Sequence, residues 1–225
     1  MTAADTTDEA ASTHRSREVV AVILAGGLAR RMGGRPKALL ELGGKPLVAH
    51  AIARLRPQVS AMLINANADH DALMVHGLPV MADVVPGHAG PLAGILTGLR
   101  WAQTSHPHAR WLLSVAVDTP FFPLTLAADM RTAIIREKAD LACAASGGRH
   151  HPVFGLWPLH LADALEEALV REDLRKIDRF TARHRLAVVD YPVEGDCDPF
   201  FNINRPKDLQ KAAALMAACA AWQKP

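Results

Sequence analysis

Cysteines are few in this sequence, and long apolar segments are absent. Only three cysteines occur in 225 residues, at Cys143, Cys197 and Cys219, and no CxxC pair is among them. An odd and widely spaced set does not suggest a disulfide framework, which favours a reducing compartment. No apolar run approaches the length of a membrane-spanning helix. We therefore expect a cytoplasmic protein that does not cross a membrane.

The sequence also has little excess charge of either sign. Its 25 Lys and Arg against 23 Asp and Glu leave a formal net charge of +2, which is too small to argue for nucleic acid as a partner. Residues 1–18 are polar and contain no apolar core, so we expect a disordered lead and not a signal peptide. Residues 19–225 contain no linker or repeat, which predicts a single catalytic domain.

Two familiar phosphate-binding motifs are missing. No GxGxxG occurs, and Gly44-Lys45 is followed by Pro46, so there is no GxxxxGK[ST] either. A dinucleotide fold of the common type and a Walker-type NTPase are both disfavoured. A different loop is present instead: the stretch from Leu24 to Lys37, LAGGLARRMGGRPK, holds four glycines and four cations directly after an apolar strand.

This loop has the chemistry of a triphosphate site. Glycines lack a Cβ, so backbone N–H groups can approach phosphate oxygens closely. Positive charge comes from four side chains of the loop, Arg30, Arg31, Arg35 and Lys37. The preceding run, Val19–Leu24, is apolar at every position, which is typical of a parallel strand buried on both faces. Its carboxyl end is expected to open onto a ligand crevice.

Strand and helix patterns alternate along the rest of the chain. Strands are expected at 19–24, 62–65, 79–82, 111–117, 141–145, 152–157 and 187–191, and helices at 46–56, 69–75, 91–103, 126–138, 159–170, 174–183 and 206–222. Repeated βα units of this length predict an α/β fold with a mostly parallel sheet and right-handed crossovers.

The glycine-rich loop resembles the signature of the molybdenum cofactor guanylyltransferases, which belong to the MobA-like nucleotidyltransferases. That signature is LAGG, a basic RMGG segment and then a lysine. The matching positions are Leu24, Ala25, Gly26, Gly27, Arg31, Met32, Gly33, Gly34 and Lys37. The family usually has an aspartate before the lysine, where this chain has Pro36, which removes a backbone donor and fixes φ. The resemblance implies a three-layer, Rossmann-like nucleotidyltransferase fold.

A single carboxylate follows the strand at 111–117, in the triplet Asp118-Thr119-Pro120. Mg²⁺ in phosphate-transferring sites prefers one or two carboxylates, completed by phosphate oxygens and water. The resemblance agrees, because the family's metal-binding aspartate lies in a DTP motif after an apolar strand. It implies Mg²⁺ on Asp118, with Mn²⁺ as a possible substitute. The alternative is that Asp118 only caps the following turn.

Nucleobase recognition requires donors and acceptors at fixed positions. Asn65 and Asn67 follow one strand, and Asp83 follows another; an acidic acceptor suits the N–H edge of guanine. The resemblance implies nucleotide contacts from Asn65 and Asp83, together with the loop residues Leu24, Ala25, Gly26 and Gly27. The alternative is that these side chains cap turns, and for Asn67 we prefer that alternative.

Three further segments resemble family motifs and are candidates for the second substrate. Gly90-Pro91 begins a GPLAGI motif, where backbone N–H groups could bind a phosphate or the pterin, while Gly94 and Gly98 are expected to pack against the sheet. His151 lies in an HP segment; with His150 it lacks the third partner that a zinc site needs. Asn202 and Asn204 form an NxN motif, whose amides would share one face of a strand. Asn204 or Arg205 could instead cap the helix that Pro206 begins.

The reaction that the resemblance implies is transfer of GMP from GTP to the phosphate of molybdopterin, with release of pyrophosphate. Asp118, Lys37 and Arg31 would be the catalytic residues. A CTP-dependent molybdopterin cytidylyltransferase and a corrinoid guanylyltransferase are the enzyme alternatives, and a GTP-binding regulator is the non-enzyme alternative. The expected partners are GTP, molybdopterin and, transiently, molybdoenzyme maturation proteins, with no nucleic acid and no membrane.

Overall fold

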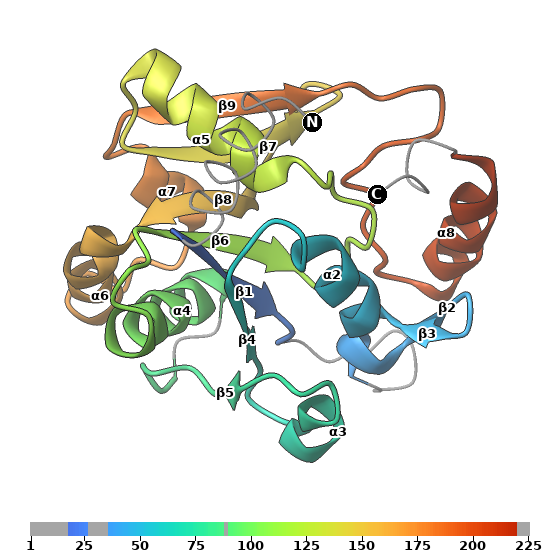
Figure 1. Cartoon of the computed structure of the whole chain (residues 1–225), viewed down its shortest axis with the longest axis horizontal. Helices are drawn as coiled ribbons and strands as arrows, with labels where there is room; N and C mark the ends of the chain where they lie inside the picture. The colour runs from blue at the N-terminus through green and yellow to red at the C-terminus, as the bar shows by residue number, and fades with distance from the viewer. Residues whose placement is uncertain (1–17, 27–35, 88–89, 220–225) are drawn as a thin grey trace, which may run out of the picture.

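A sheet of seven strands forms the centre of the structure, a computed structural model that describes residues 18–26, 36–87 and 90–219. The strand order is β5-β4-β1-β6-β8-β7-β9 (Figure 1). Their bounds are β1 Val19–Leu24, β4 Ala61–Asn65, β5 Val80–Met81, β6 Trp111–Ala116, β7 Leu141–Ser146, β8 Arg149–Pro158 and β9 Leu186–Tyr191. Every pairing is parallel except those of β8, which confirms a mostly parallel α/β sheet.

Helices cover both faces of this sheet. Their bounds are α2 Leu47–Leu55, α3 His70–Met74, α4 Pro91–Ser105, α5 Leu126–Glu137, α6 Ala162–Val170, α7 Ile177–Thr181 and α8 Pro206–Ala218, with 3₁₀ turns η2 Lys37–Leu39 and η3 Leu159–Leu161. β1 is buried along its whole length. Ala21 and Ile23 pack in one core with α2 and α5, while Val20 and Val22 pack in a second core with α4 and α6. The alternation of side chains along the strand therefore produces three layers, as expected.

The β7–β8 connection breaks the pattern of crossovers. Gly147 and Gly148, both at positive φ, connect Ser146 to its partner Arg149, so β8 returns antiparallel to β7. A two-residue turn of this kind joins antiparallel strands, whereas a parallel pair needs a much longer connection. β8 also begins three residues before the predicted strand at 152–157.

Other predicted boundaries shift by a few residues. The helix expected at 174–183 is only α7, Ile177–Thr181, and the last helix ends at Ala218. A short hairpin, β2 Glu41–Leu42 and β3 Lys45–Pro46, was not expected. Over the parts of the chain that the structure describes, no helix has the length and apolarity to span a membrane. The expected lead at 1–18 falls, except for its last residue, outside the described residues.

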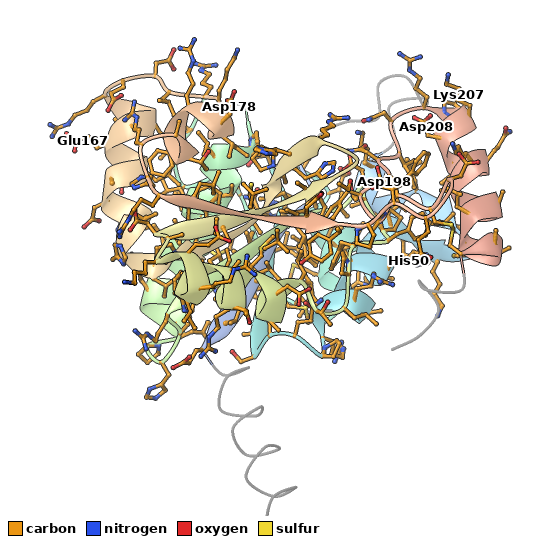
Figure 2. All side chains as sticks on the ribbon, turned by 90° about the horizontal axis from the view of Figure 1, so that it is seen from above. His50, Glu167, Asp178, Asp198, Lys207 and Asp208 are labelled. Atoms are coloured by element: carbon orange, nitrogen blue, oxygen red, sulfur yellow. A yellow bond between two sulfur atoms is a disulfide. The ribbon has the colours of Figure 1, made fainter. Side chains whose placement is uncertain are left out.

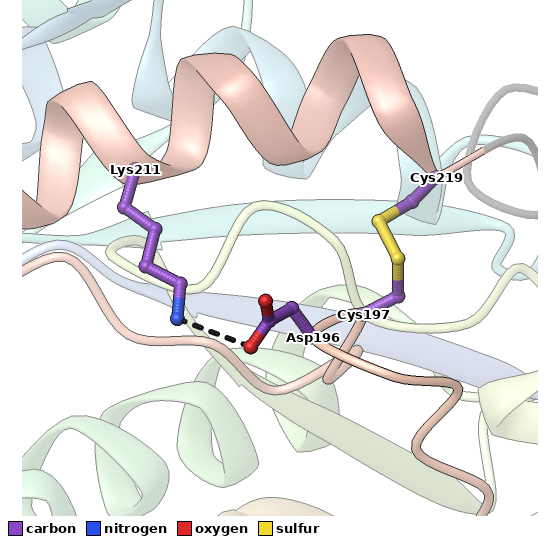
Figure 3. Close-up of a disulfide and its surroundings, with 4 residues drawn as sticks. All are labelled: Asp196, Cys197, Lys211 and Cys219. Atoms are coloured by element: carbon purple, nitrogen blue, oxygen red, sulfur yellow. Dashed lines mark ion pairs between the residues drawn. A yellow bond between two sulfur atoms is a disulfide. The ribbon is translucent and has the colours of Figure 1, made fainter.

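The cysteine prediction is wrong for two of the three residues. Cys197 and Cys219 form a disulfide, with a Cα–Cα distance of 6.0 Å, that attaches the end of α8 to the loop before it (Figure 3). Lys211 and Asp196 form an ion pair at 3.6 Å between the same two segments. The third cysteine, Cys143, is buried and free, and burial raises its pKa to about 11. The pairing depends on how α8 folds back, which cysteine spacing does not show.

Removing the disulfide should lower stability. Cys197→Ser removes a covalent link between residues that are 22 positions apart in the sequence. We expect the free energy of unfolding to fall by about 3 kcal/mol. Urea unfolding with and without reductant measures this difference. The reductant should destabilise the wild-type protein to the level of the variant and leave the variant unchanged. Equal stability of the oxidised and reduced wild-type protein would contradict the prediction.

Candidate active site

The carboxyl ends of three adjacent strands form the edge at which the candidate site lies. Leu24 is in register with Asn65 of β4 and with Ala116 of β6. The N–H of Ala25 donates to the carbonyl of Asn65 at 2.9 Å, and the N–H of Val117 donates to the carbonyl of Leu24 at 3.2 Å. These bonds join the ends of β1, β4 and β6, so residues that follow the three strands lie at one edge of the sheet, where open α/β sheets form their ligand crevice.

The glycine-rich loop enters this edge from β1. Gly26 is exposed there, and no atom of the described residues lies within 4 Å of the position where a Cβ would be. An exposed backbone with this much free space is accessible to a phosphate. The other loop residues that we predicted for the site, Gly27 and Arg31, lie outside the described residues.

Lys37 and Asp118 meet in this crevice although they are 81 residues apart in the sequence. Lys37 Nζ lies 2.7 Å from Asp118 Oδ2. Only 17% of the Lys37 side chain and 15% of the Asp118 side chain are exposed, so water screens this pair less than a surface pair. Two of the three residues that we expected to be catalytic, Lys37 and Asp118, are therefore in direct contact.

Pro36 does not prevent this contact. It has an extended backbone directly before η2, with φ −57° and ψ 127°, and its carbonyl accepts the N–H of Leu39 at 3.1 Å. A proline at the start of a helical turn loses no hydrogen bond, because the first N–H groups of a helix have no intrahelical acceptor. The geometry of Lys37 is thus compatible with the departure from the family signature.

Two asparagines complete the cluster. Asn204 Oδ1 accepts a hydrogen bond from Lys37 Nζ at 2.6 Å, and Asn202 Nδ2 donates to Asp118 Oδ1 at 3.2 Å. Between them, the N–H of Ile203 donates to the backbone carbonyl of Asp118 at 2.8 Å. Each polar group of the Lys37–Asp118 pair therefore has a partner on the segment that precedes α8.

The NxN segment is not the strand that we expected. Residues 201–204 form an irregular stretch, yet Ile203 is buried and the flanking asparagines are exposed on the crevice side. The alternative role at a helix start also holds. Arg205 is the N-cap of α8 and Pro206 its first residue, and Asp208 Oδ2 accepts the backbone N–H groups of Asn204 and Arg205 at 3.0 and 2.8 Å. The helix start and the site contacts thus occur together.

The donor set suits a hard cation. Asp118 offers a carboxylate and Asn204 an amide oxygen, and oxygen ligands of this kind, completed by phosphate and water, are what Mg²⁺ prefers. Within 18–26, 36–87 and 90–219, no group of three or more His, Cys, Asp or Glu side chains could hold a metal ion. A metal ion bound at Asp118 would therefore need further oxygen ligands from outside this set of side chains.

The candidate base-recognition residues form a second cluster. Asn65 is 5% exposed, and its Nδ2 donates to Asp83 Oδ1 at 3.0 Å and to the carbonyl of Met81 at 3.2 Å. Asn67 Nδ2 donates to Asp83 Oδ2 at 2.8 Å, and Asn67 Oδ1 accepts the backbone N–H of Asp83 at 2.8 Å. The two amides hold the carboxylate of Asp83 in place at the edge of the sheet. Each carboxylate oxygen keeps a further lone pair for a ligand donor.

Close packing of α4 supports this cluster. A Cβ on Gly94 would lie 2.3 Å from Asn65 Oδ1 and 2.6 Å from Leu24 Cδ2, and one on Gly98 would lie 2.9 Å from a methyl carbon of Leu112. These distances confirm that both glycines pack against the sheet. Gly94 in particular lets the first turn of α4 touch the two strand ends that carry Leu24 and Asn65.

A basic cavity that we did not predict from the sequence lies beside Gly90. It has a volume of about 650 Å³ and is lined by Glu172, Asp173, Leu174, Arg175, Lys176, Arg179, Ala182 and Arg183. The carbonyl of Arg175 lies 3.7 Å from the position of a Cβ on Gly90, so the cavity adjoins the start of α4. Arg175 and Arg183 are paired with Asp173 and Glu172. The density of cations between 171 and 183 was the signal that could have indicated it.

Comparisons with known proteins agree with this geometry. Residues 21–187 match the family model of the MobA-like NTP transferase domain. A solved structure, molybdopterin-guanine dinucleotide biosynthesis protein A from Archaeoglobus fulgidus, superposes with a TM-score of 0.68 at 25% identity, covering 89% of this chain and 99% of that one. CMP:2-keto-3-deoxy-manno-octonic acid synthetase, at 14% identity and a TM-score of 0.68, shares the fold. The fold and the site together define a Rossmann-like nucleotidyltransferase.

Curated relatives narrow this class. A molybdenum cofactor guanylyltransferase from Bradyrhizobium sp. (strain ORS 278) is 51% identical over 199 residues, which cover 88% of this chain and 93% of the relative. Another, from Rhodopseudomonas palustris (strain BisB5), is 50% identical over 87% of this chain and 92% of the relative. The chain belongs to the molybdenum cofactor guanylyltransferase family.

Proposed function

We propose that this protein transfers GMP from GTP to the terminal phosphate of a molybdopterin-type cofactor and releases pyrophosphate. The observation that carries the proposal is the contact of Lys37 with Asp118, at the strand edge where the glycine-rich loop begins. The names of its relatives at 51% and 50% identity support guanine and molybdopterin as the substrates.

The reaction is an in-line displacement. An oxygen of the acceptor phosphate forms a bond to the α-phosphorus of GTP, and the bond from that phosphorus to the bridging oxygen of pyrophosphate breaks. The acceptor phosphate is already ionised near neutral pH, so no general base is needed. Catalysis then depends on positioning and on stabilising the negative charge that develops on the phosphate oxygens.

Four side chains that meet at this edge of the sheet would perform these tasks. Bound Mg²⁺, held by Asp118, would supply positive charge to the nucleotide phosphates. Lys37 would leave Asp118 and turn its ammonium to the α-phosphate or to the departing pyrophosphate. Asn202 and Asn204, which hold the pair in the free protein, would orient the same groups. Arg31 is proposed as a further phosphate ligand on the basis of the family signature.

The cluster around Asp83 and the basic cavity at 172–183 would select the two substrates. Asp83, held by Asn65 and Asn67, is an acceptor for the N1–H and amino group of guanine, which cytosine does not present in that pattern. The basic cavity at 172–183, next to Gly90 and Pro91, offers cations to an anionic acceptor. In this proposal the base would bind at the cluster of Asn65, Asn67 and Asp83, and the acceptor would bind near the cavity.

Calorimetric titration with GTP, CTP, ATP and UTP, each with and without Mg²⁺, tests the proposal. We expect GTP to bind selectively and Mg²⁺ to strengthen its binding, followed by pyrophosphate release when molybdopterin is added. A preference for CTP would instead support a cytidylyltransferase. GTP binding that never leads to pyrophosphate release, with molybdopterin present, would support the regulator alternative and contradict the enzyme.

A further inference from the structure

Three residues from different parts of the chain, His151, Ser146 and Asp198, form a hydrogen-bonded chain that we call the relay. Ser146, at the end of β7, is 2% exposed. Its Oγ lies 2.8 Å from Asp198 Oδ1 and 2.8 Å from Nε2 of His151, which is on β8. Asp198 is on the chain that leads from β9 to α8, and Figure 2 labels it near the start of that helix. The relay thus joins the sheet to the loop that carries Asn202 and Asn204.

The direction of the protons in this relay follows from the donors available. An ionised carboxylate only accepts, so the single hydroxyl proton of Ser146 is donated to Asp198. The Ser146 oxygen can then only accept from His151, which requires a proton on Nε2. Burial lowers the pKa of His151, against the opposing charge of Asp198. A neutral His151 is therefore the Nε2–H tautomer, with Nδ1 unprotonated.

The same carboxylate organises the turn that follows it. Asp198 Oδ1 also accepts the N–H of Phe200 at 2.9 Å. Phe200 is 4% exposed. Its ring stacks on the His151 ring, with 4.6 Å between the ring centroids, and contacts the Phe154 ring edge-on, with 5.0 Å between the centroids. Asp198 therefore bonds Ser146, and Phe200 packs on His151, so both members of this turn contact the pair of Ser146 and His151.

The NxN segment has no strand ladder in the described residues, so separate contacts hold it: the buried Ile203 with its N–H bond to the carbonyl of Asp118, and the contacts of residues 198–200 directly before it. Asn202 comes two residues after Phe200, and its Nδ2 donates a hydrogen bond to Asp118 Oδ1 at 3.2 Å. A shift of about 1 Å in such a group is enough to reduce catalysis strongly. We propose that the relay of His151, Ser146 and Asp198 positions Asn202 and Asn204 against Asp118 and Lys37 for nucleotidyl transfer. The inference rests on the proposed function.

The first test compares two substitutions of one residue. Asp198→Ala removes the acceptor of both the Ser146 hydroxyl and the Phe200 N–H, and we expect kcat to fall about tenfold, as for loss of a hydrogen bond to a charged group. Asp198→Asn keeps the Oδ1 acceptor, and kcat should stay within about twofold of wild type for the same reason. The KM for GTP should change little in either variant, because the Asn65–Asp83 cluster is untouched.

A second pair of variants separates positioning from loss of stability. Ser146→Ala breaks the relay, and we expect it to match Asp198→Ala. Ser114→Ala is the control: Ser114 is fully buried on β6, donates to the carbonyl of Val153 at 2.6 Å and accepts from Trp157 Nε1 at 2.9 Å. It lies outside the relay, so kcat should remain at the wild-type level even when the melting temperature falls as far as in Ser146→Ala.

Nitrogen NMR of His151 supplies a readout that is independent of turnover. The wild-type ring should show a protonated Nε2 and an acceptor Nδ1, and Ser146→Ala should abolish this preference. A wild-type ring with the proton on Nδ1 would overturn the relay. An unchanged kcat in both Asp198→Ala and Ser146→Ala, or an equal loss in Ser114→Ala, would overturn the positioning role. If wild type transfers no nucleotide, the proposed function fails while the NMR result still decides whether the relay exists.

Discussion

Asp118→Ala is expected to abolish turnover while the protein stays folded. Asp118 is the only carboxylate that contacts Lys37 in the described part of the crevice. Its loss removes the proposed metal ligand, and we expect kcat to fall by at least about 10³-fold, the range seen when a charge-stabilising group is removed. The free energy of unfolding should fall by about 1–3 kcal/mol, since a part-buried charged hydrogen bond is lost while Lys37 keeps its bond to Asn204. Pyrophosphate release and urea unfolding measure the two effects.

Asp118→Asn shows whether charge or shape matters. The amide keeps the size and one oxygen acceptor but loses the negative charge, so this variant should be as inactive as Asp118→Ala. Asp140→Asn is the control, because Asp140 also pairs with a cation, Arg185, at 2.8 Å, and this pair is more exposed, with 35% of the Asp140 side chain and 71% of the Arg185 side chain accessible. It should turn over GTP at the wild-type rate. Mg²⁺-dependent activity that survives in Asp118→Ala would contradict the metal assignment.

Regular elements could be predicted because their patterns are local. The unbroken apolar run of Val19–Leu24 became the buried strand β1, and the apolar face of the predicted helix at 91–103 is buried in α4. The position of Asp118 followed from the end of a parallel strand, since such ends share one edge. The direction of β8 could not be predicted from hydrophobicity, because it depends on the two glycines of the tight turn between β7 and β8.

Local sequence patterns could not predict contacts between residues that lie far apart in the sequence. Nothing in the spacing of Cys197 and Cys219 shows that α8 folds back onto its own preceding loop. The cavity at 172–183 was not predicted, because a run of cations in the sequence is equally typical of a solvated helix face. The family motif made Asn202 and Asn204 candidates for the site. The structure then supplied the contacts, and it replaced the expected strand by an irregular segment.

Lys37→Met should have opposite effects on catalysis and on metal binding to the free protein. Methionine keeps the length of the side chain but removes the ammonium, and we expect kcat/KM for GTP to fall about 10²-fold to 10³-fold, as when a preorganised donor to the transition state is lost. Lys37→Arg should recover part of this activity, because it keeps the charge but not the compact geometry.

Without nucleotide, the same variant should bind Mn²⁺ more tightly than wild type. In the free protein the ammonium of Lys37 lies 2.7 Å from Asp118 Oδ2 and competes with a cation for that carboxylate. Removing the competitor leaves a part-buried negative charge without its counter-ion, which favours a divalent cation. Mn²⁺ titration followed by electron paramagnetic resonance measures this, with Lys45→Met, an exposed lysine on β3, as the control. Weaker Mn²⁺ binding in Lys37→Met would mean that the lysine only supports Asp118 and does not alternate between the carboxylate and the phosphates.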